Sequence, residues 1–320
     1  MKAKTIEKVL AKKFGEWLDS IEDNDVKSLV AKNTIITGGA IASMLLGEDV
    51  NDFDVYFTNW ATTHAVAQYY VKRFTQKKAN GIPCAIFVGN EVGDPCSPGG
   101  RVKVYIKSAG IASAESTEKP YEYFESSQEG RATDYVSEVM TDPGEIEDTY
   151  TEVETGVLRQ SDDEQPKYRP VFMSSNAITL SGKVQVILRF FGNAEELHEN
   201  YDFVHCMNYW TSAEKKVVLR QPALEALLAK ELRYVGSKYP LCSIMRLRKF
   251  IKRGWTVNAG QILKMAMQLN AMDLLDPAVL EDQLTGVDSA YFAEVIRKLA
   301  EKDPEKINCA YLIEIIDRMF

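Results

Sequence analysis

The stretch from Thr34 to Phe57 constrains the fold more than any other part of the chain. Ile35 and Ile36, followed by Gly38-Gly39, predict a short buried strand that ends in a tight turn. Ala40 to Leu46 predicts a helix directly after the turn. A helix that begins at two glycines offers its first backbone N–H groups to an anion and lets that anion come close. The stretch therefore predicts a phosphate-binding turn.

A second strand follows the helix, from Asn51 to Phe57. Its period of two places Asp52 and Asp54 on one face. Two carboxylates on one face of a strand repel each other, and aspartate is disfavoured in strands. A divalent cation is the common means of compensating such a pair. Together with the glycine turn, the pair predicts a site for a metal–nucleoside triphosphate.

This order of motifs resembles the nucleotidyltransferase superfamily, which includes DNA polymerase β, poly(A) polymerases, CCA-adding enzymes and antibiotic nucleotidyltransferases. Its signature is an apolar residue, Gly, then Gly or Ser, and further on Asp-x-Asp between apolar residues. Gly38, Gly39, Asp52 and Asp54 match it. Many members use the hydroxyl of Ser at the second position, which the resemblance here assigns to backbone N–H or to Ser43. The alternative is a plain glycine turn before a solvent-facing acidic strand.

The composition limits the possible partners and compartments. The 320 residues carry a formal net charge of −8, so nucleic acid would have to bind at a local basic patch. The five cysteines never form a C-x-x-C pair, which favours a reducing compartment over a zinc site or a disulfide frame. No apolar run reaches membrane-spanning length. We expect a cytoplasmic protein without a membrane partner.

Patterning along the chain predicts an α+β fold with a mixed-sheet nucleotidyltransferase catalytic domain followed by an α-helical domain. We expect the catalytic domain in residues 1–90 plus 170–212, an insertion in 91–169 and the helical domain in 213–320. The segment 114–165 is strongly acidic, which suits a solvated surface insertion. An acidic regulator that competes for a basic cleft is the alternative.

The resemblance also implies a third carboxylate on a strand beside Asp52-x-Asp54. Tyr201 to Cys206 reads as a later strand, and Asp202 near its start is the best-placed candidate. An ordinary aspartate at the start of a strand is the alternative. His205, three residues on, points to the other face and is expected to be structural.

The charge pattern reverses after residue 212. Tyr234, Tyr239 and Trp255 are interleaved with cations, and exposed rings beside cations suit triphosphates and single-stranded nucleic acid. A solvated basic helix face is the alternative. An apolar stripe of Ile244, Leu247 and Ile251 is expected to face the core and turn the cations outward. We assign nucleotide binding to Gly38, Gly39, Ser43, Lys216, Lys230, Lys238 and Tyr239, and nucleic-acid binding to Arg246, Arg248, Lys249, Lys252 and Arg253.

The resemblance implies nucleotidyl transfer with Mg²⁺ or Mn²⁺, an NTP donor and an acceptor hydroxyl. Asp52 and Asp54 are expected to hold the ion of the triphosphate, and Asp54 and Asp202 a second ion. An RNA 3′ end is the expected acceptor, extended without a template. A protein or small-molecule acceptor is the first alternative. A non-catalytic binding protein is the second.

Overall fold

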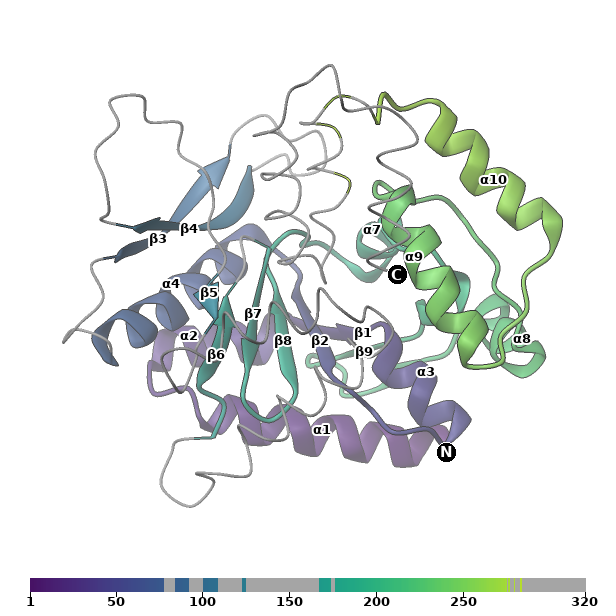
Figure 1. Cartoon of the computed structure of the whole chain (residues 1–320). Helices are drawn as coiled ribbons and strands as arrows, with labels where there is room; N and C mark the ends of the chain where they lie inside the picture. The colour runs from purple at the N-terminus through teal and green to yellow at the C-terminus, as the bar shows by residue number, and fades with distance from the viewer. Residues whose placement is uncertain are drawn as a thin grey trace.

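The computed structural model shows a mixed α/β protein with helices after the sheet (Figure 1). It describes residues 1–77, 84–91, 100–108, 123–124, 167–173, 176–274, 276, 279 and 283. The elements are α1 (Ala3–Asp19), α2 (Asn24–Asn33), β1 (Thr34–Thr37), α3 (Gly39–Leu46), β2 (Phe53–Phe57), α4 (Trp60–Lys77), β3 (Cys84–Glu91), β4 (Arg101–Ser108), β5 (Tyr123–Phe124), β6 (Pro170–Met173), β7 (Ala177–Leu180), β8 (Val184–Ile187), α7 (Ala194–His198), the 3₁₀ turn η1 (Val204–Cys206), β9 (Tyr209–Thr211), β10 (Val217–Val218), α8 (Gln221–Ala229), α9 (Pro240–Lys252) and α10 (Ala259–Asn270).

The main sheet has eight strands in the order β10-β9-β1-β2-β8-β7-β6-β5. Its pairs are antiparallel except β2 with β8, which run parallel. The expected mixed sheet is therefore confirmed. Strands β3 and β4 pair separately, close to the two strands that Pro83–Val88 and Val102–Ile106 predict.

Helices α1, α2 and α4 cover one face of the sheet (Figure 1). They bury residues such as Leu10, Val30 and Tyr70 against Val55 and Val186 of β2 and β8. The sequence spacing over residues 5–31 reads as one helix, but the structure has two. Asp23 explains the break because its side chain accepts from the N–H groups of Asp25 and Val26 and caps a new helix.

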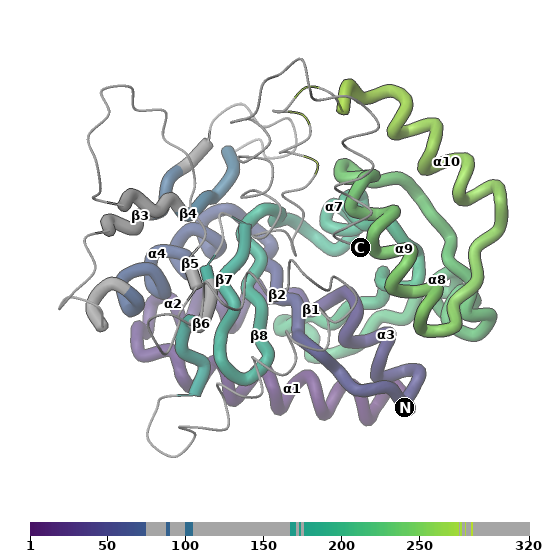
Figure 2. Tube along the Cα trace, viewed as in Figure 1, coloured from purple at the N-terminus to yellow at the C-terminus, as the bar shows by residue number. Residues whose placement is uncertain are grey.

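The chain after β10 forms helices that pack beside α3, as the trace in Figure 2 shows. A separate apolar cluster joins Ala42 of α3 to Phe203, Leu227, Trp255 and Met265. The predicted helical region is therefore present in α8, α9 and α10. The periodic segments predicted beyond residue 290, and most of the acidic segment 114–165, lie outside the described residues. The domain boundaries stay a prediction.

Two residues of the acidic segment do belong to the sheet. Tyr123 and Phe124 form β5, which pairs with Met173 and Phe172 of β6 at the sheet edge. The segment 114–165 therefore contributes an edge strand to the structure. Across the part of the chain that the structure describes, no helix has both the length and the apolar character to span a bilayer.

Candidate active site

The turn after β1 brings the backbone against an acidic side chain. Gly38 has φ of 91° and ψ of −151°, and it caps α3. A Cβ built on Gly38 would lie 2.8 Å from Oδ2 of Asp54 and 3.6 Å from the hydroxyl of Tyr201. Only glycine fits here, because both the backbone conformation and the space exclude a side chain.

Gly39 differs from Gly38 in both respects. It is exposed, and a Cβ built on it would meet nothing within 4 Å. The N–H of Gly38 is already used, since it donates to the carbonyl of Cys206 at 3.2 Å. An anion at this turn would therefore be held by N–H groups from Gly39 onward, at the N-terminus of α3, where the helix dipole also favours it.

Asp54 lies in a polar row that crosses the sheet. In the register of the strands it is opposite Thr37 of β1 on one side and Gln185 of β8 on the other, and Gln185 is opposite Thr179 of β7. Residues directly opposite in neighbouring strands share a face. Asp54 is half-buried, and Asp52 is exposed in the loop before β2. Asp52 therefore lies outside the strand in which the sequence places it.

Asp202 also belongs to this region, but it does not lie on a strand. It is in the loop between α7 and η1, where Phe203 makes only a single bridge to Tyr234. The predicted strand Tyr201–Cys206 is therefore wrong. The residue on the strand beside Asp54 is Gln185, which is neutral.

Asp202 forms an ion pair with Arg246 of α9. The Nη1 of Arg246 lies 2.7 Å from Oδ2 of Asp202, and Asp202 is 8% exposed. Burial, then the charges of Asp202 and Asp54, raises the pKa of the Cys206 thiol well above its ordinary value. The carboxylates of Asp54 and Asp202 therefore both lie near Cys206, and the carbonyl of Cys206 accepts the hydrogen bond from the N–H of Gly38. The turn, Asp54, Asp202 and Arg246 form one site.

Two tyrosines line the same site. Burial, followed by the charge of Asp54, raises the pKa of Tyr56. Burial also raises the pKa of Tyr201, whose ring lies 6.2 Å from that of Tyr56. Both hydroxyls therefore stay protonated beside Asp54 at neutral pH and are available as neutral donors.

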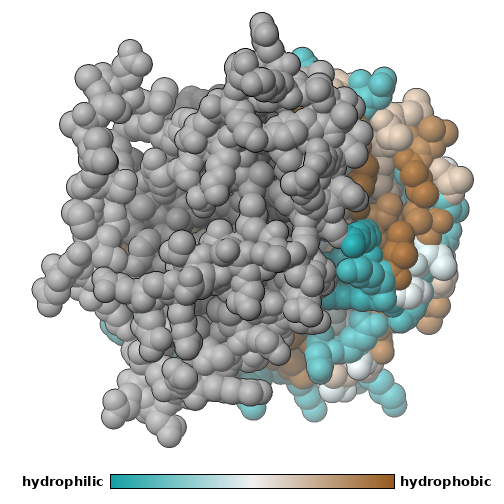
Figure 3. Space-filling model, viewed as in Figure 1, coloured by the Kyte–Doolittle hydropathy of each residue, from teal (hydrophilic) through white to brown (hydrophobic). Residues whose placement is uncertain are grey.

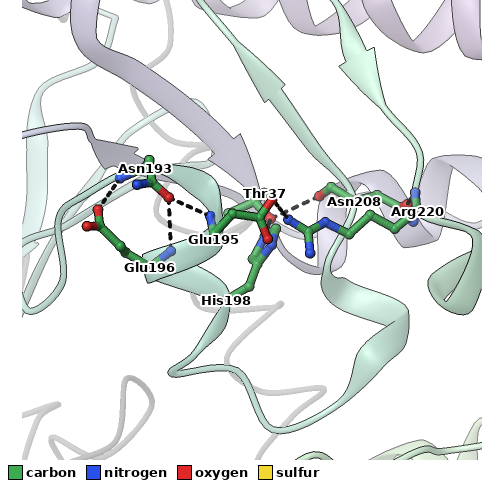
Figure 4. A network of polar contacts seen from close by, with 7 residues as sticks. All are labelled: Thr37, Asn193, Glu195, Glu196, His198, Asn208 and Arg220. Carbon is green, nitrogen blue, oxygen red and sulfur yellow. Dashed lines mark hydrogen bonds and ion pairs between the residues drawn. The ribbon is translucent and has the colours of Figure 1, made fainter.

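A polar network fastens α7 to the end of β1 (Figure 4). The hydroxyl of Thr37 donates to the carbonyl of Asn208 at 2.9 Å and lies 2.9 Å from Nε2 of His198. The tautomer of His198 with hydrogen on Nε2 satisfies both contacts. Burial lowers the pKa of His198 to about 4, so the ring is neutral. The guanidinium of Arg220 forms an ion pair with Glu195 of α7, and the backbone N–H of Arg220 donates to Oδ1 of Asn208. This network fixes the end of β1 from which the glycine turn begins.

Several predicted nucleotide-binding residues lie away from this turn. Lys230 is 3.5 Å from Glu48, beyond the C-terminal end of α3. Lys216 is exposed beside β10, where the N–H of Val217 donates to Glu7 of α1. Ser43 is half-buried on α3, about one turn after Gly39. Of this set, Gly38, Gly39 and Ser43 belong to the turn and its helix.

The predicted orientation of α9 is wrong. Ile244 and Ile251 are 39% and 49% exposed, whereas Arg246 turns inward to Asp202. Figure 3 shows apolar surface on the right of the view, on the side where Figure 1 draws α9 and α10. The buried face holds Ser243, with Leu247 and Phe250 packed on the second cluster. Arg248, Lys252 and Arg253 are exposed, and Lys249 is half-buried.

The predicted exposed aromatic rings are also wrong. Tyr234, Tyr239 and Trp255 are 2%, 8% and 5% exposed. Tyr239 accepts from Nε of Arg189 at 3.0 Å, and Trp255 packs 4.4 Å from the ring of His205. His205 is 1% exposed, which confirms its structural role. Tyr234 and Trp255 therefore belong to the apolar cluster between the helices, and Tyr239 is nearly buried beside Arg189.

The site also contains residues that the sequence interpretation missed. Gln185 could have been found from its strand, because Val184 and Val186 point inward and leave Gln185 beside Asp54. Arg246, which the sequence assigned to nucleic-acid binding, and Tyr201 gave no signal of their place beside Asp202 and the glycine turn, since each reaches the site from a loop or helix whose position depends on the tertiary fold. Within the described residues no group of three or more His, Cys, Asp or Glu side chains is arranged to hold a metal ion.

These features define the class: a mixed α/β protein whose glycine turn lies against a carboxylate at the edge of a helical region. The chain belongs to the Gabija anti-defense 2 family, because the model described as "Gad2: Gabija anti-defense 2 family protein" matches residues 8–230. No curated protein matches the chain.

Two solved structures are similar to it, the Bacillus stearothermophilus CCA-adding enzyme in complex with CTP and the Thermotoga maritima CCA-adding enzyme complexed with tRNA. Each is 12% identical with a TM-score of 0.36. The matches cover 86% of this chain and 49% of the first, and 90% of this chain and 53% of the second. The chain thus spans about half the length of these enzymes.

Proposed function

We propose that this protein transfers a nucleoside monophosphate from an NTP to a hydroxyl group, with one divalent cation. One observation carries the proposal. The glycine turn at the N-terminus of α3 leaves no room between its backbone and the carboxylate of Asp54. An anion-binding helix N-terminus beside a carboxylate suits a metal–triphosphate, because the helix binds phosphate and the carboxylate binds the metal.

The aspartate side chains at this site suit one divalent cation better than two. Asp52 and Asp54 supply the carboxylate oxygens that Mg²⁺ or Mn²⁺ prefers. Asp202 is held by Arg246 at 2.7 Å, so its charge is already compensated. We assign the metal to Asp52 and Asp54 on the chemistry of their oxygens and on the position of Asp54 against the glycine turn. Asp202 becomes a positioning residue that fixes Arg246 next to the site.

When bound, the cation neutralises phosphate charge and makes the acceptor hydroxyl easier to deprotonate. In this proposal the N–H groups from Gly39 onward hold the triphosphate, and the buried hydroxyl of Tyr201, 3.6 Å from a Cβ built on Gly38, helps to fix the turn. The acceptor oxygen forms a bond to the α-phosphorus and loses its proton to solvent. The bond from that phosphorus to the β-phosphate breaks, and pyrophosphate leaves with the electron pair.

We infer that the acceptor is a protein hydroxyl rather than an RNA 3′ end. The three rings offered for base stacking are buried, which removes the main structural argument for RNA. Several cations of the basic run are neutralised, since Arg233 pairs with Glu225 at 3.0 Å and Arg220 pairs with Glu195. The family description names anti-defense against Gabija, and we propose a protein of that defence as the acceptor.

The test supplies all acceptors together. The full chain is incubated with each α-³²P-labelled NTP, Mg²⁺ or Mn²⁺, purified Gabija proteins and total RNA. We expect label on protein in the wild type, and none with Asp54→Asn, whose fold is checked by circular dichroism. Label on RNA alone makes RNA the acceptor. No label on either pool, with any NTP or ion, contradicts nucleotidyl transfer.

A further inference from the structure

A cavity of about 660 Å³ lies beside the N-terminus of α9. Its wall includes Arg189 after β8, Lys238 and Tyr239 before α9, Met272 after α10, and Gln283. The volume is in the range of small-molecule binding sites. Neither Asp54 nor Asp202 lines it.

One side of the cavity is positively charged and firmly held. Arg189 is 8% exposed, and its Nε donates to the hydroxyl of Tyr239 at 3.0 Å. The guanidinium of Arg189 and the ammonium of Lys238 lie 5.7 Å and 5.3 Å from the ring centre of Phe190. Two positively charged side chains thus lie against the same ring at the cavity wall, which favours a ligand with acceptor atoms there.

Gln283, in contrast, requires a hydrogen-bond donor on the ligand. This side chain is 3% exposed, and its Nε2 donates to the carbonyl of Lys238 at 2.8 Å. Its Oε1 is buried and has no hydrogen-bond partner in the described part of the chain. Buried acceptors without a partner are rare in proteins, so Oε1 calls for a donor on a ligand. Asp273 adds a carboxylate to the wall.

This combination discriminates between ligand classes. Phosphate and sulfate carry only acceptor oxygens, so Gln283 and Asp273 would oppose them. A purely apolar ligand would satisfy neither the cations nor Oε1. A nucleobase offers donors and acceptors on the edges of one apolar plane, and Ala271, Met272 and Val279 supply apolar contacts for that plane. Guanine fits best, with the acceptors O6 and N7 for Arg189 and Lys238 and N–H donors for Gln283.

We propose that this cavity binds the base of a nucleotide, guanine in preference to adenine, and that it selects the donor of the transfer reaction. The selecting role rests on the proposed function, whereas base binding does not. The distance suits one ligand. Tyr239 at the cavity and Arg246 at Asp202 are seven residues apart along α9, which is about 10 Å. The selecting role requires one nucleotide to span this separation, with its base in the cavity and its phosphates on the side of Arg246.

Binding is measured by calorimetry with GMP, AMP, GTP and ATP, without added metal for the monophosphates. Ala271→Trp fills the cavity from an exposed position, and Gln283→Leu removes the buried acceptor. Met267→Trp is the matched control, because Met267 is 67% exposed on α10 and lies outside the cavity wall. We expect GMP to bind roughly tenfold tighter than AMP, and each cavity variant to weaken GMP roughly tenfold while the control does not.

Two results overturn the inference: equal binding of GMP and AMP, or unchanged GMP affinity in both cavity variants. Failure of the proposed function is seen separately. If GMP binding is lost in Ala271→Trp but no NTP labels any acceptor, the cavity binds a base and transfer is wrong. If all four NTPs label the acceptor equally and Ala271→Trp labels normally, transfer stands and the cavity does not select the donor.

Discussion

Gly38 and Gly39 are adjacent but have different reasons to be glycine. Gly38→Ala should destabilise the fold by about 1–3 kcal/mol, since alanine would be strained at φ 91° and its Cβ would meet Asp54 at 2.8 Å. Gly39→Ala should leave the free energy of unfolding nearly unchanged, because its Cβ has open space. It should nevertheless weaken NTP binding, since that space is where we place the phosphates.

Urea denaturation and NTP titration measure the two effects. The prediction fails if Gly39→Ala is as unstable as Gly38→Ala. It also fails if Gly39→Ala is stable and binds NTP like the wild type, because the space above the helix N-terminus is then unused.

The pair of Asp202 and Arg246 gives a second prediction at this scale. Arg246→Met leaves a carboxylate that is 8% exposed without its charged partner, and we expect a loss of about 1–3 kcal/mol. Asp202→Asn combined with Arg246→Met should lose less than the sum of the two single changes. A double-mutant cycle by denaturation measures this coupling. Strictly additive losses would mean that the ion pair does not stabilise the site.

His205 predicts how stability depends on pH. Its ring lies 4.4 Å from Trp255 and 4.7 Å from Phe250, and burial lowers its pKa to about 4. The unfolded chain takes up this proton near pH 6.5, whereas the folded protein does so only near pH 4. The unfolded state therefore binds more protons in this window, and stability falls as pH decreases from 6.5 to 4.

His205→Phe should reduce this loss of stability, measured as the urea midpoint of unfolding at pH 7, 6 and 5. Part of the loss should remain in the variant, because the pKa of His198 is also lowered to about 4. An unchanged pH slope in the variant would show that His205 titrates normally in the folded protein.

At the scale of elements, the sequence predicted strands and helices better than their faces. The turn from β1 to α3 and strand β2 follow from local signals: two glycines, a helical run and alternating apolar residues. The sequence placed Ile244 and Ile251 on the buried face of α9 because a local apolar stripe carries no information about Asp202, which lies much earlier in the chain and draws Arg246 inward.

 The position of Arg246, 44 residues after its partner in the chain, depends on a tertiary contact that no local pattern reports.

The Asp202 loop shows the same limit. Tyr201-Asp202-Phe203 alternates like a strand, but the chain makes one bridge at Phe203 and then the 3₁₀ turn η1. What fixes Asp202 is its partner on α9, together with the bond from Gly38 to the carbonyl of Cys206. Asp54 on β2 and Asp52 just before it were therefore predictable from their spacing, whereas the residues that surround them were not.

A variant in the exposed cations of α9 distinguishes a protein acceptor from an RNA acceptor. Its exposed cations Arg248, Lys252 and Arg253 are the remaining candidates for nucleic-acid contact at its C-terminal end. Changing all three to Gln should leave stability within about 0.5 kcal/mol for each, as expected for exposed positions. We expect protein labelling to persist in the variant and any RNA affinity to fall, with a flatter dependence on salt. Loss of RNA labelling together with RNA affinity would instead support the RNA acceptor.

At the scale of the whole molecule, the acidic segment is tied to the sheet by β5. A deletion of residues 127–164, closed by a short Gly/Ser linker, keeps Tyr123 and Phe124 and should fold like the full chain. A deletion of residues 114–165 removes β5 and uncovers the edge of β6, so it should be less stable and more prone to associate. Thermal melting and gel filtration compare the two. Equal behaviour would mean that β5 adds nothing to the fold.

The only parallel pair among the described strands, β2 with β8, has a consequence for how the protein is made. Its two strands are separated by a long stretch of chain, and Arg246 comes later still. At a synthesis rate of ~5–20 residues per second, the ribosome needs roughly 10–40 s after Asp54 to reach Arg246. Before Val184 the nascent chain has the glycine turn and Asp54 but lacks the parallel strand β8, and until Arg246 it also lacks the partner of Asp202. The proposed transfer activity therefore requires synthesis of the chain beyond Arg246, and we expect products truncated before that residue to be inactive.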